Sequence, residues 1–327
     1  MVKIDLKDRK ILYYLDLDAR QSFSQLGKKV GLRKDVVSYR IKKMQDEGVI
    51  TNFWTQIDSY KLGYNVFRYY IVLQNTNQKI KNEIIQHLVN YKNTWVVGTI
   101  KGVYDLVAVI WIKSIPDFYK FWDEINDKYG DYFAEKIFSV YLQAYCYPLT
   151  YLIHDNYEKS DRDTYERLTG GGQPVDVDEL DYRLLNELAE NARISLLDLA
   201  QKLGCSSQTV DYRIKNLKKN DVIQAFRVNV DNSKLGFEHF KVDIYLKEPS
   251  QRKHLFDYLK NNPFVTFINT SAGYADIEVE LVIQNSDEMI RLMDEISVKF
   301  PSAIKKYTYF STLKDYKLRC LPESPKS

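Results

Sequence analysis

The sequence is poor in cysteine and histidine and has no long apolar run. Its 327 residues include three cysteines and four histidines. Cys146, Cys205 and Cys320 are too few and too scattered for a disulfide framework or a zinc cluster, which predicts reduced thiols. No run approaches the roughly 20 apolar residues of a membrane-spanning helix, and residues 1–8 lack the apolar core of a secretion signal. We therefore expect a cytoplasmic protein without membrane attachment.

Motifs of common catalytic sites are also missing. The sequence contains no P-loop, no Gly-x-Gly-x-x-Gly and no His-Glu-x-x-His, and its four histidines do not have the spacing of metal ligands. Adjacent acids such as Asp123 and Glu124 fall on predicted helices, where a solvated face is the simpler interpretation. We accordingly predict no catalytic residues, no metal site and no cofactor.

The sequence does contain two copies of one unit. Residues 8–73 align with residues 181–246 at an offset of 173, with 24 of 66 positions identical and no gap. Later the offset becomes 171. Between the copies, residues 154–174 are polar and contain three consecutive glycines, which predicts a flexible linker.

The first third of each copy predicts a helix-turn-helix. Ser22 has the form of a helix N-cap, Gly31 ends a short second helix, and a third helix runs from just beyond it to about Glu47. The extended segment that follows is typical of a short wing. The second copy repeats these signals at Asp178, Ser195 and Gly204.

The third helix predicts a surface for double-stranded DNA. At ~100° per residue, Val37, Ile41 and Met44 fall in one sector and face the core, and polar residues lie opposite. A basic rim around a polar helix face suits phosphate contacts at the rim and base contacts at the centre. A lysine-rich helix is often only a solvated face, but its place in a repeated helix-turn-helix favours DNA. The predicted contacts in the first copy are Lys28, Lys29, Arg33, Lys34, Asp35, Ser38, Tyr39, Arg40, Lys42 and Lys43.

The second copy is less basic than the first. Residues 1–60 hold 12 basic and 8 acidic residues, whereas residues 174–233 hold 8 and 10. Gln208 could read adenine, but Asp211 would repel phosphate. We therefore expect the first copy to dominate affinity and the second to tune specificity. Its predicted contacts are Ser207, Gln208, Tyr212, Arg213 and Lys215.

The remainder of each copy predicts an α+β, ferredoxin-like domain with the order β-α-β-β-α-β. Helices cover one face of such a sheet, so the other copy is expected to cover its second face. The predicted domains are winged helix-turn-helix domains at 1–57 and 175–230, ferredoxin-like domains at 58–153 and 231–322, and the linker at 154–174.

This order resembles the Lrp/AsnC (feast/famine) family of prokaryotic transcription regulators, duplicated in tandem. The most specific motifs are Tyr39-Arg-Ile-Lys-Lys-Met44, the Lys-Leu-Gly63 turn and Gly102-Val-Tyr-Asp105. The resemblance implies an internal pseudo-dimer of RAM-type domains, assembly into homo-oligomers, and an amino acid or related metabolite as effector. The implied effector residues are Gly102, Tyr104, Asp105, Gly273 and Asp276.

Two departures from the family pattern affect the predicted sites. The family usually has Ser at the N-cap of the third helix. Ser206 keeps it, but Arg33 cannot accept hydrogen bonds from the backbone N–H groups there, so we expect a frayed turn until a phosphate binds. Ala275 replaces the motif tyrosine of the second loop, which weakens its case as an effector site.

The main hypothesis is therefore a sequence-specific DNA-binding transcription regulator. The same fold also resembles the siroheme decarboxylases, whose activity would need His and Arg side chains converging on a large tetrapyrrole pocket. A co-regulator that binds only protein is a third interpretation, favoured by the acidic second copy.

Overall fold

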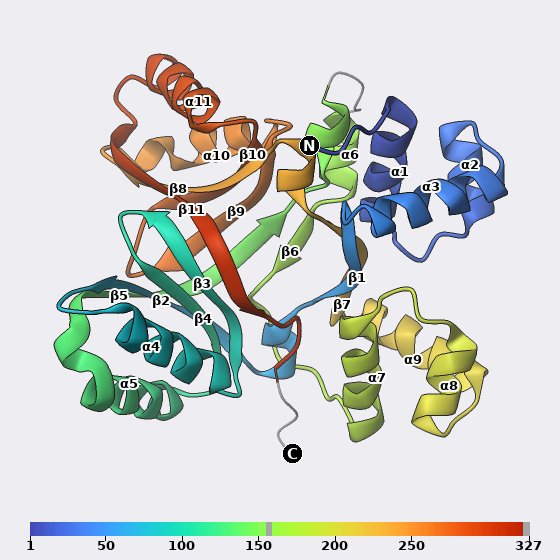
Figure 1. Ribbon diagram of the computed structural model, residues 1–327, viewed down its shortest axis with the longest axis horizontal. Coiled ribbons are helices and arrows are strands. Elements are labelled where there is room, and N and C mark those ends of the chain that lie inside the picture. Colours follow the sequence, from blue (N-terminus) through green and yellow to red (C-terminus); the bar gives the residue numbers. More distant parts are fainter. Residues whose placement is uncertain (155–158, 323–327) are drawn as a thin grey trace.

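The computed structural model describes residues 1–154 and 159–322. Two helix-turn-helix domains lie together on one side of the molecule, and the two ferredoxin-like domains form a barrel of strands beside them (Figure 1). Among the described residues, no helix is long and apolar enough to cross a membrane. The two predicted copies thus fold as two pairs of like domains.

Each helix-turn-helix domain is a three-helix unit closed by local signals. Its helices are α1 (Leu6–Leu17), α2 (Phe23–Val30) and α3 (Lys34–Asp46) in the first copy, and α7 (Glu179–Glu190), α8 (Leu196–Leu203) and α9 (Ser207–Lys219) in the second. The Ser22 side chain accepts a hydrogen bond from the backbone N–H of Gln25, and Gly31 ends α2 at a φ of 68°. Ser195 and Gly204, with a φ of 69°, do the same around α8. The predicted caps are therefore confirmed.

The strand after each third helix pairs with its counterpart in the other copy. β1 (Ile50–Ile57) and β7 (Ile223–Val230) form a two-stranded antiparallel sheet. The backbone N–H of Ala19 donates to the carbonyl of Phe226 at 2.8 Å, and Ala192 donates to the matching position of β1 at 2.9 Å. The segment predicted as a short wing therefore joins the two helix-turn-helix domains to each other.

The long strands of the ferredoxin-like domains close into an antiparallel barrel. The first copy supplies β2 (Asn65–Leu73), β3 (Thr94–Gly102), β4 (Leu106–Ile112) and β5 (Phe133–Cys146), and the second supplies β8 (Glu238–Leu246), β9 (Val265–Ala272), β10 (Ile277–Ile283) and β11 (Ile304–Leu318). Their order is β2-β4-β3-β11-β8-β10-β9-β5, and β5 also pairs with β2, which closes the ring. β5 pairs first with β2 and then with β9, whereas β11 pairs with β8 and then with β3. These two strands join the copies along both seams.

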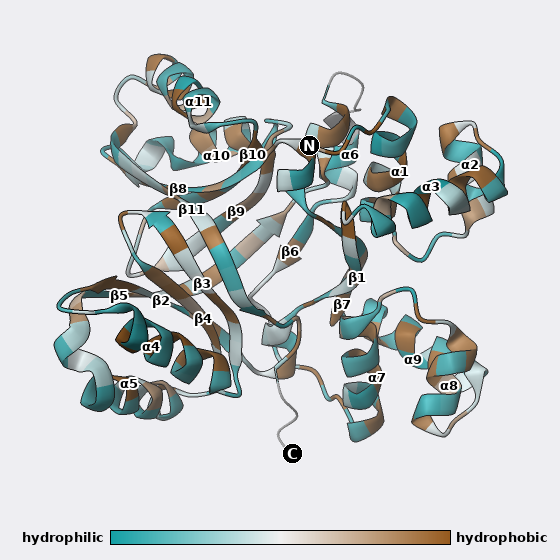
Figure 2. Cartoon of the chain, viewed as in Figure 1, coloured by the Kyte–Doolittle hydropathy of each residue, from teal (hydrophilic) through white to brown (hydrophobic). Residues whose placement is uncertain are grey.

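Alternation along the strands separates the inside of the barrel from its outside. On β2, Phe67, Tyr69 and Ile71 pack outward against α4 and α5, whereas Arg68 and Tyr70 point inward. In Figure 2 the ribbons of β2 and β4 are largely brown and α7 is largely teal. The prediction that each copy covers the open sheet face of the other is confirmed. The outer faces of the strands are covered by helices, which are α4 (Gln78–Asn90), α5 (Ile115–Tyr129), α10 (Arg252–Lys260) and α11 (Ser286–Lys299).

The stretch between the copies is anchored over its described part. It contains α6 (Lys159–Thr164) and β6 (Arg167–Thr169), and β6 pairs with the end of β5. The guanidinium of Arg162 is buried and donates to Oγ1 of Thr150 at 2.6 Å and to two backbone carbonyls. The described residues of 154–174 therefore differ from the flexible linker that the sequence predicts, and residues 155–158 lie outside the described part.

Candidate functional site

The third helix of each copy turns its polar face to solvent. Val37, Ile41 and Met44 are buried, as their angular spacing predicts. In contrast, the Tyr39 side chain is 68% exposed, and Tyr212 at the matching position of α9 is 70% exposed. Neither helix is inserted into the interior of the protein, so both polar faces are accessible to a ligand.

The arginines in the middle of α3 and α9 point back into their own domains. Nη1 of Arg40 donates to Oδ2 of Asp5 and Oδ1 of Asp8, both at 2.8 Å. Arg213 makes the same two contacts with Asp178 and Asp181 at the start of α7. These ion pairs favour a structural role for the two arginines, and their contact with DNA stays a prediction. They fasten the third helix of each domain to the first, and the hydrogen bond to Asp8 is the main reason why the pKa of Arg40 is raised.

Three lysines keep the surface of the first copy basic. Lys28, Lys34 and Lys42 are exposed, and none of them forms an ion pair with a described residue. Ser38 is half-buried and lies on the same exposed helix, one residue before Tyr39. These side chains provide exposed positive charge around hydrogen-bonding groups, which is the chemistry that phosphates and base edges recognise.

The other cations predicted for this surface have partners within the chain. Arg33 pairs with Asp35 at 3.2 Å, although the Arg33 side chain remains 84% exposed. Nζ of Lys43 lies 3.9 Å from a carboxylate oxygen of Glu47, and Lys29 donates to a glutamine side chain. Exposed pairs of this kind contribute roughly 0–1 kcal/mol each, so an anionic ligand can compete with them.

The beginnings of α3 and α9 differ as the sequence predicts. Arg33 makes no side-chain hydrogen bond to the first turn of α3. Ser206, by contrast, accepts a hydrogen bond from the backbone N–H of Thr209 at 3.0 Å. The first turn of α3 therefore lacks the side-chain cap that α9 has.

The exposed face of α9 is less basic than that of α3 over its first two turns, whereas its last turn carries Lys218 and Lys219 where α3 has Gln45 and Asp46. Nζ of Lys215 donates to a carboxylate oxygen of Asp211 at 2.6 Å, which offsets its charge. Gln208 is exposed and Ser207 half-buried in the first turn. This face thus offers neutral and acidic hydrogen-bonding groups where the first copy offers lysines.

Reciprocal contacts hold the two helix-turn-helix domains together. Nη1 of Arg20 donates to the carbonyls of Ala192 and Ile194 at 2.7 and 2.9 Å. Arg193, the matching residue, donates to the carbonyls of Ala19 and Gln21. The two contacts are related by the internal repeat, so the exposed third helices belong to one paired unit.

A buried ion pair ties α1 of the first copy to β7 of the second copy. Nε and Nη2 of Arg227 on β7 donate to the two carboxylate oxygens of Asp16 on α1 at 2.8 and 2.9 Å. Asp16 also accepts the backbone N–H of Leu149 at 2.9 Å. The matching positions of the repeat hold Trp54 and Ala189, which cannot form this pair.

The loops predicted to hold an effector brace the barrel. Oδ2 of Asp105 accepts a backbone N–H from the end of β2, and Oδ2 of Asp276 accepts one from the end of β8, both at 2.8 Å. Gly102 and Gly273 turn the chain with φ values of 149° and 81°. A Cβ at Gly102 would lie 2.8 Å from a carbonyl oxygen of β11, so this position requires glycine.

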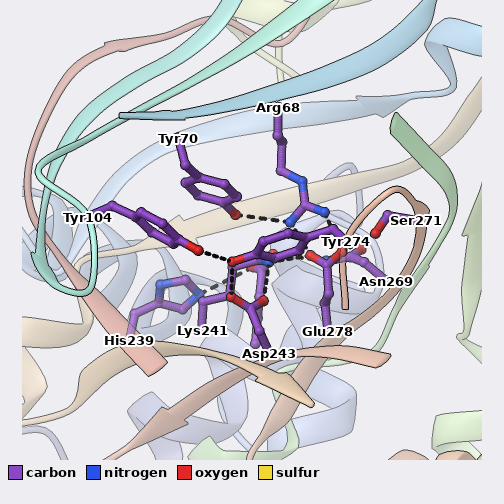
Figure 3. A network of polar contacts seen from close by, with 11 residues as sticks. Arg68, Tyr70, Tyr104, His239, Lys241, Asp243, Asn269, Ser271, Tyr274 and Glu278 are labelled. Carbon is purple, nitrogen blue, oxygen red and sulfur yellow. Dashed lines mark hydrogen bonds and ion pairs between the residues drawn. The ribbon is translucent and has the colours of Figure 1, made fainter. Parts of the chain in front are cut away.

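A network of charged side chains lies inside the barrel (Figure 3). The carboxylate of Glu278 on β10 accepts hydrogen bonds from the guanidinium of Arg68 on β2 and from the ammonium group of Lys241 on β8. Lys241 also donates to Oδ1 of Asp243 at 2.9 Å. All four side chains are buried. Burial raises the pKa of Glu278, but the charges of Lys241 and Arg68 outweigh it and lower the pKa to about 2.

Two tyrosines from the Gly-containing loops extend this network. The hydroxyl of Tyr274 donates to Oδ2 of Asp243 at 2.7 Å, and the hydroxyls of Tyr104 and Tyr274 are 2.9 Å apart (Figure 3). Tyr274 precedes Ala275, the residue at the position of the motif tyrosine. Both loops therefore deliver a phenol to the barrel interior, although from different positions in the motif.

Sequence reasoning missed both buried ion networks. A signal was present on β8, where Lys241 and Asp243 interrupt an apolar strand at a spacing of two, and on β10, where Glu278 and Glu280 do the same. Such a pattern in a strand covered on both faces indicates charges that must pair inside. The pairing of Arg227 with Asp16 carried no comparable local signal.

The fold and the exposed helices define a tandem protein with two helix-turn-helix domains on a shared barrel. The profile of the AsnC-type helix-turn-helix domain matches residues 177–218, and that of a winged helix-turn-helix DNA-binding domain matches residues 4–51. The uncharacterized HTH-type transcriptional regulator PF1231 of Pyrococcus furiosus is 30% identical over 127 residues, which are 39% of this chain and 82% of that protein. The HTH-type transcriptional regulator LrpA of Pyrococcus horikoshii is 29% identical over 127 residues, covering 39% and 86%. The chain belongs to the Lrp/AsnC family.

A solved structure shares the whole tandem arrangement. The siroheme decarboxylase NirDL superposes on 98% of this chain and 95% of its own, with a TM-score of 0.65 and 13% sequence identity. At this identity the likeness establishes the fold alone. It shows that two helix-turn-helix and two ferredoxin-like domains form one architecture.

Proposed function

We propose that this protein is a sequence-specific DNA-binding transcription regulator of the Lrp/AsnC type. The observation that supports it best is the outward-facing polar surface of α3, where Lys28, Lys34 and Lys42 are exposed without carboxylate partners among the described residues. The helix would enter the major groove, as in other helix-turn-helix proteins. A regulator of this kind would act beside the genome, in the cytoplasm.

Each predicted contact has a distinct task in this proposal. Lys28 and Lys34 neutralise backbone phosphates, whereas Ser38, Tyr39 and Lys42 lie near the base edges. Arg40 and Arg213 keep their structural role. Each neutralised phosphate releases condensed counterions, so binding must weaken as the salt concentration rises.

The test is a pair of substitutions on α3. In the variant with Lys34→Ala and Lys42→Ala, affinity should fall, and the slope of log affinity against log salt concentration should flatten by about one phosphate contact, or roughly 0.9, through the loss of Lys34. Fluorescence anisotropy with a labelled duplex at several salt concentrations measures it. The matched control replaces two exposed lysines on barrel helices, Lys120→Ala and Lys253→Ala, and should retain the wild-type slope. An unchanged slope in the α3 variant would refute the interface.

An effector and further assembly extend this proposal. An amino acid or related metabolite near the Tyr104 and Tyr274 loops would act on the barrel that carries both helix-turn-helix domains. Thermal shift measurements with the individual amino acids test for it. Light scattering of the intact chain distinguishes a monomer with only the internal pairing from a homo-oligomer.

We propose regulation rather than catalysis for this chain. In NirDL the same fold serves a siroheme decarboxylase, but here Arg68 and Lys241 inside the barrel are already paired with Glu278. His239 likewise contacts a carboxylate oxygen of Glu280 at 3.3 Å. An absorbance titration with an iron-bound tetrapyrrole checks this interpretation, and a saturable Soret change would support an enzyme instead.

A further inference from the structure

The two helix-turn-helix domains share one scaffold but expose different side chains. At the offset of 173, the buried Val37 and Ile41 and the bracing Arg40 recur as Val210, Ile214 and Arg213. The exposed Tyr39 and Lys42 also recur, as Tyr212 and Lys215. The buried and bracing residues are thus repeated, and the reciprocal contacts of Arg20 and Arg193 relate the two domains by the same repeat. The scaffold alone would present two equivalent surfaces.

Several exposed or half-exposed positions break this equivalence, and four of them are predicted contacts within the third helix. From α3 to α9, Lys34 becomes Ser207, Asp35 becomes Gln208, Ser38 becomes Asp211 and Lys43 becomes Asn216. A glutamine can form two hydrogen bonds to adenine, and an aspartate accepts from the amino group of cytosine but repels phosphate. The salt bridge of Asp211 to Lys215 removes a free cation that α3 keeps in Lys42. The two helices therefore offer different hydrogen-bonding groups and charges to a ligand.

The barrel favours the pairing of one first copy with one second copy. Arg68 of the first copy corresponds to Lys241, but its carboxylate partner Glu278 corresponds to Val107, and Asp243 corresponds to Tyr70. The ion pair between Arg68 and Glu278 therefore forms only between unlike copies, whereas Lys241 pairs with Asp243 and Glu278 of its own copy. Two first copies would bring arginines together without these carboxylates, and an uncompensated buried charge destabilises a protein by several kcal/mol.

From these observations, and resting on the proposed function, we infer that the protein binds a non-palindromic DNA site in one fixed orientation. One half-site is read by α3 and a different half-site by α9. A pair of identical domains matches a two-fold symmetric site, because the symmetry of the protein is mirrored in the DNA. Here the unlike surfaces are covalently joined and locked as a pair, so the preferred site has unlike halves.

The first experiment selects bound sequences from a library of random duplexes with the full-length protein. We expect a motif of two different halves in constant order, about one helical turn or a multiple of it apart. A palindromic motif would overturn the inference while leaving DNA binding intact. Failure to enrich any sequence would count against the proposed function as well, so the two failures are distinguishable.

The second experiment gives α9 the exposed residues of α3. The variant carries Ser207→Lys, Gln208→Asp, Asp211→Ser and Asn216→Lys, which leaves the buried residues of α9 and its Ser206 cap unchanged. Its selected motif should become palindromic, with the former α3 half-site repeated, and its affinity for that palindrome should exceed the wild-type affinity at least tenfold. Circular dichroism verifies that the variant folds.

A matched control changes four exposed residues of similar type on the helices of the barrel, and its motif should stay asymmetric. If the α9 variant still selects the wild-type motif, these four positions do not read DNA and the inference is wrong.

Discussion

Replacing Glu278 should reveal how strongly the barrel depends on its buried charges. Glu278→Gln keeps the size of the side chain but leaves Arg68 and Lys241 without their shared carboxylate. Both cations are buried, and removal of one partner of a buried ion pair typically destabilises a protein by about 3–5 kcal/mol. The lowering of the Glu278 pKa from 4.5 to about 2 corresponds to a similar stabilisation, about 3 kcal/mol.

The sign of the pH dependence follows from this lowered pKa. The stabilisation is complete above the unfolded-state pKa near 4.5 and is lost as the pH falls toward about 2. The free energy of unfolding of wild type should therefore exceed that of Glu278→Gln by about 2 kcal/mol less at pH 3 than at pH 7. Urea unfolding followed by circular dichroism measures this difference.

Two further variants make this test specific. Glu83→Gln removes an exposed carboxylate from α4 and should change stability by less than about 0.5 kcal/mol. Adding Arg68→Met to Glu278→Gln removes one of the two cations that lost their carboxylate partner. It should recover part of the lost free energy of unfolding, which a double-mutant cycle quantifies. If Glu278→Gln unfolds within 1 kcal/mol of wild type at pH 7, the argument that the network locks the two copies together is refuted.

Three other predictions follow from local geometry. Arg227→Met leaves the buried Asp16 carboxylate without its guanidinium, so urea unfolding should show a loss of about 3–5 kcal/mol, and no loss would exclude a stabilising ion pair. Gly170 has a φ of 100°, and a Cβ there would lie 2.4 Å from the Leu142 carbonyl oxygen. Gly170→Ala should therefore lower the melting temperature of the protein. An unchanged melting temperature would mean that the linker is not anchored at this point. Arg33→Ser adds the missing cap of α3 and should stabilise the first helix-turn-helix domain by roughly 0.5–1 kcal/mol in thermal unfolding, whereas destabilisation would show that the arginine has a packing role.

The helix-turn-helix domains could be predicted because their signals are local. Ser22 and Gly31 fix the ends of α2 through contacts within a few residues, and the spacing of Val37, Ile41 and Met44 fixes which side of α3 is buried. The second copy repeats the same helix signals at matching positions, which supported the prediction independently. The ferredoxin-like order followed from the alternation of apolar strands and amphipathic helices.

The arginines and the linker were predicted less well because their partners are distant in sequence. Arg40 lies among lysines on α3, and only the packing of α1 beside it shows that Asp5 and Asp8 take its charge. Arg162 lies in a polar stretch that suggests a loose linker, yet its guanidinium is buried against the barrel.

The amino-acid sequence by itself determined the duplication, the helical faces and the unequal charge of the two copies, since these depend on residue order and short-range periodicity. Tertiary structure alone decided that β1 pairs with β7, that β5 and β11 close the barrel, and that Arg68 meets Glu278 across 210 residues of chain. The physical reason is that each of these contacts satisfies hydrogen-bonding or charged groups that have no partner nearby in sequence. Their pairing becomes defined only when both copies are folded against each other.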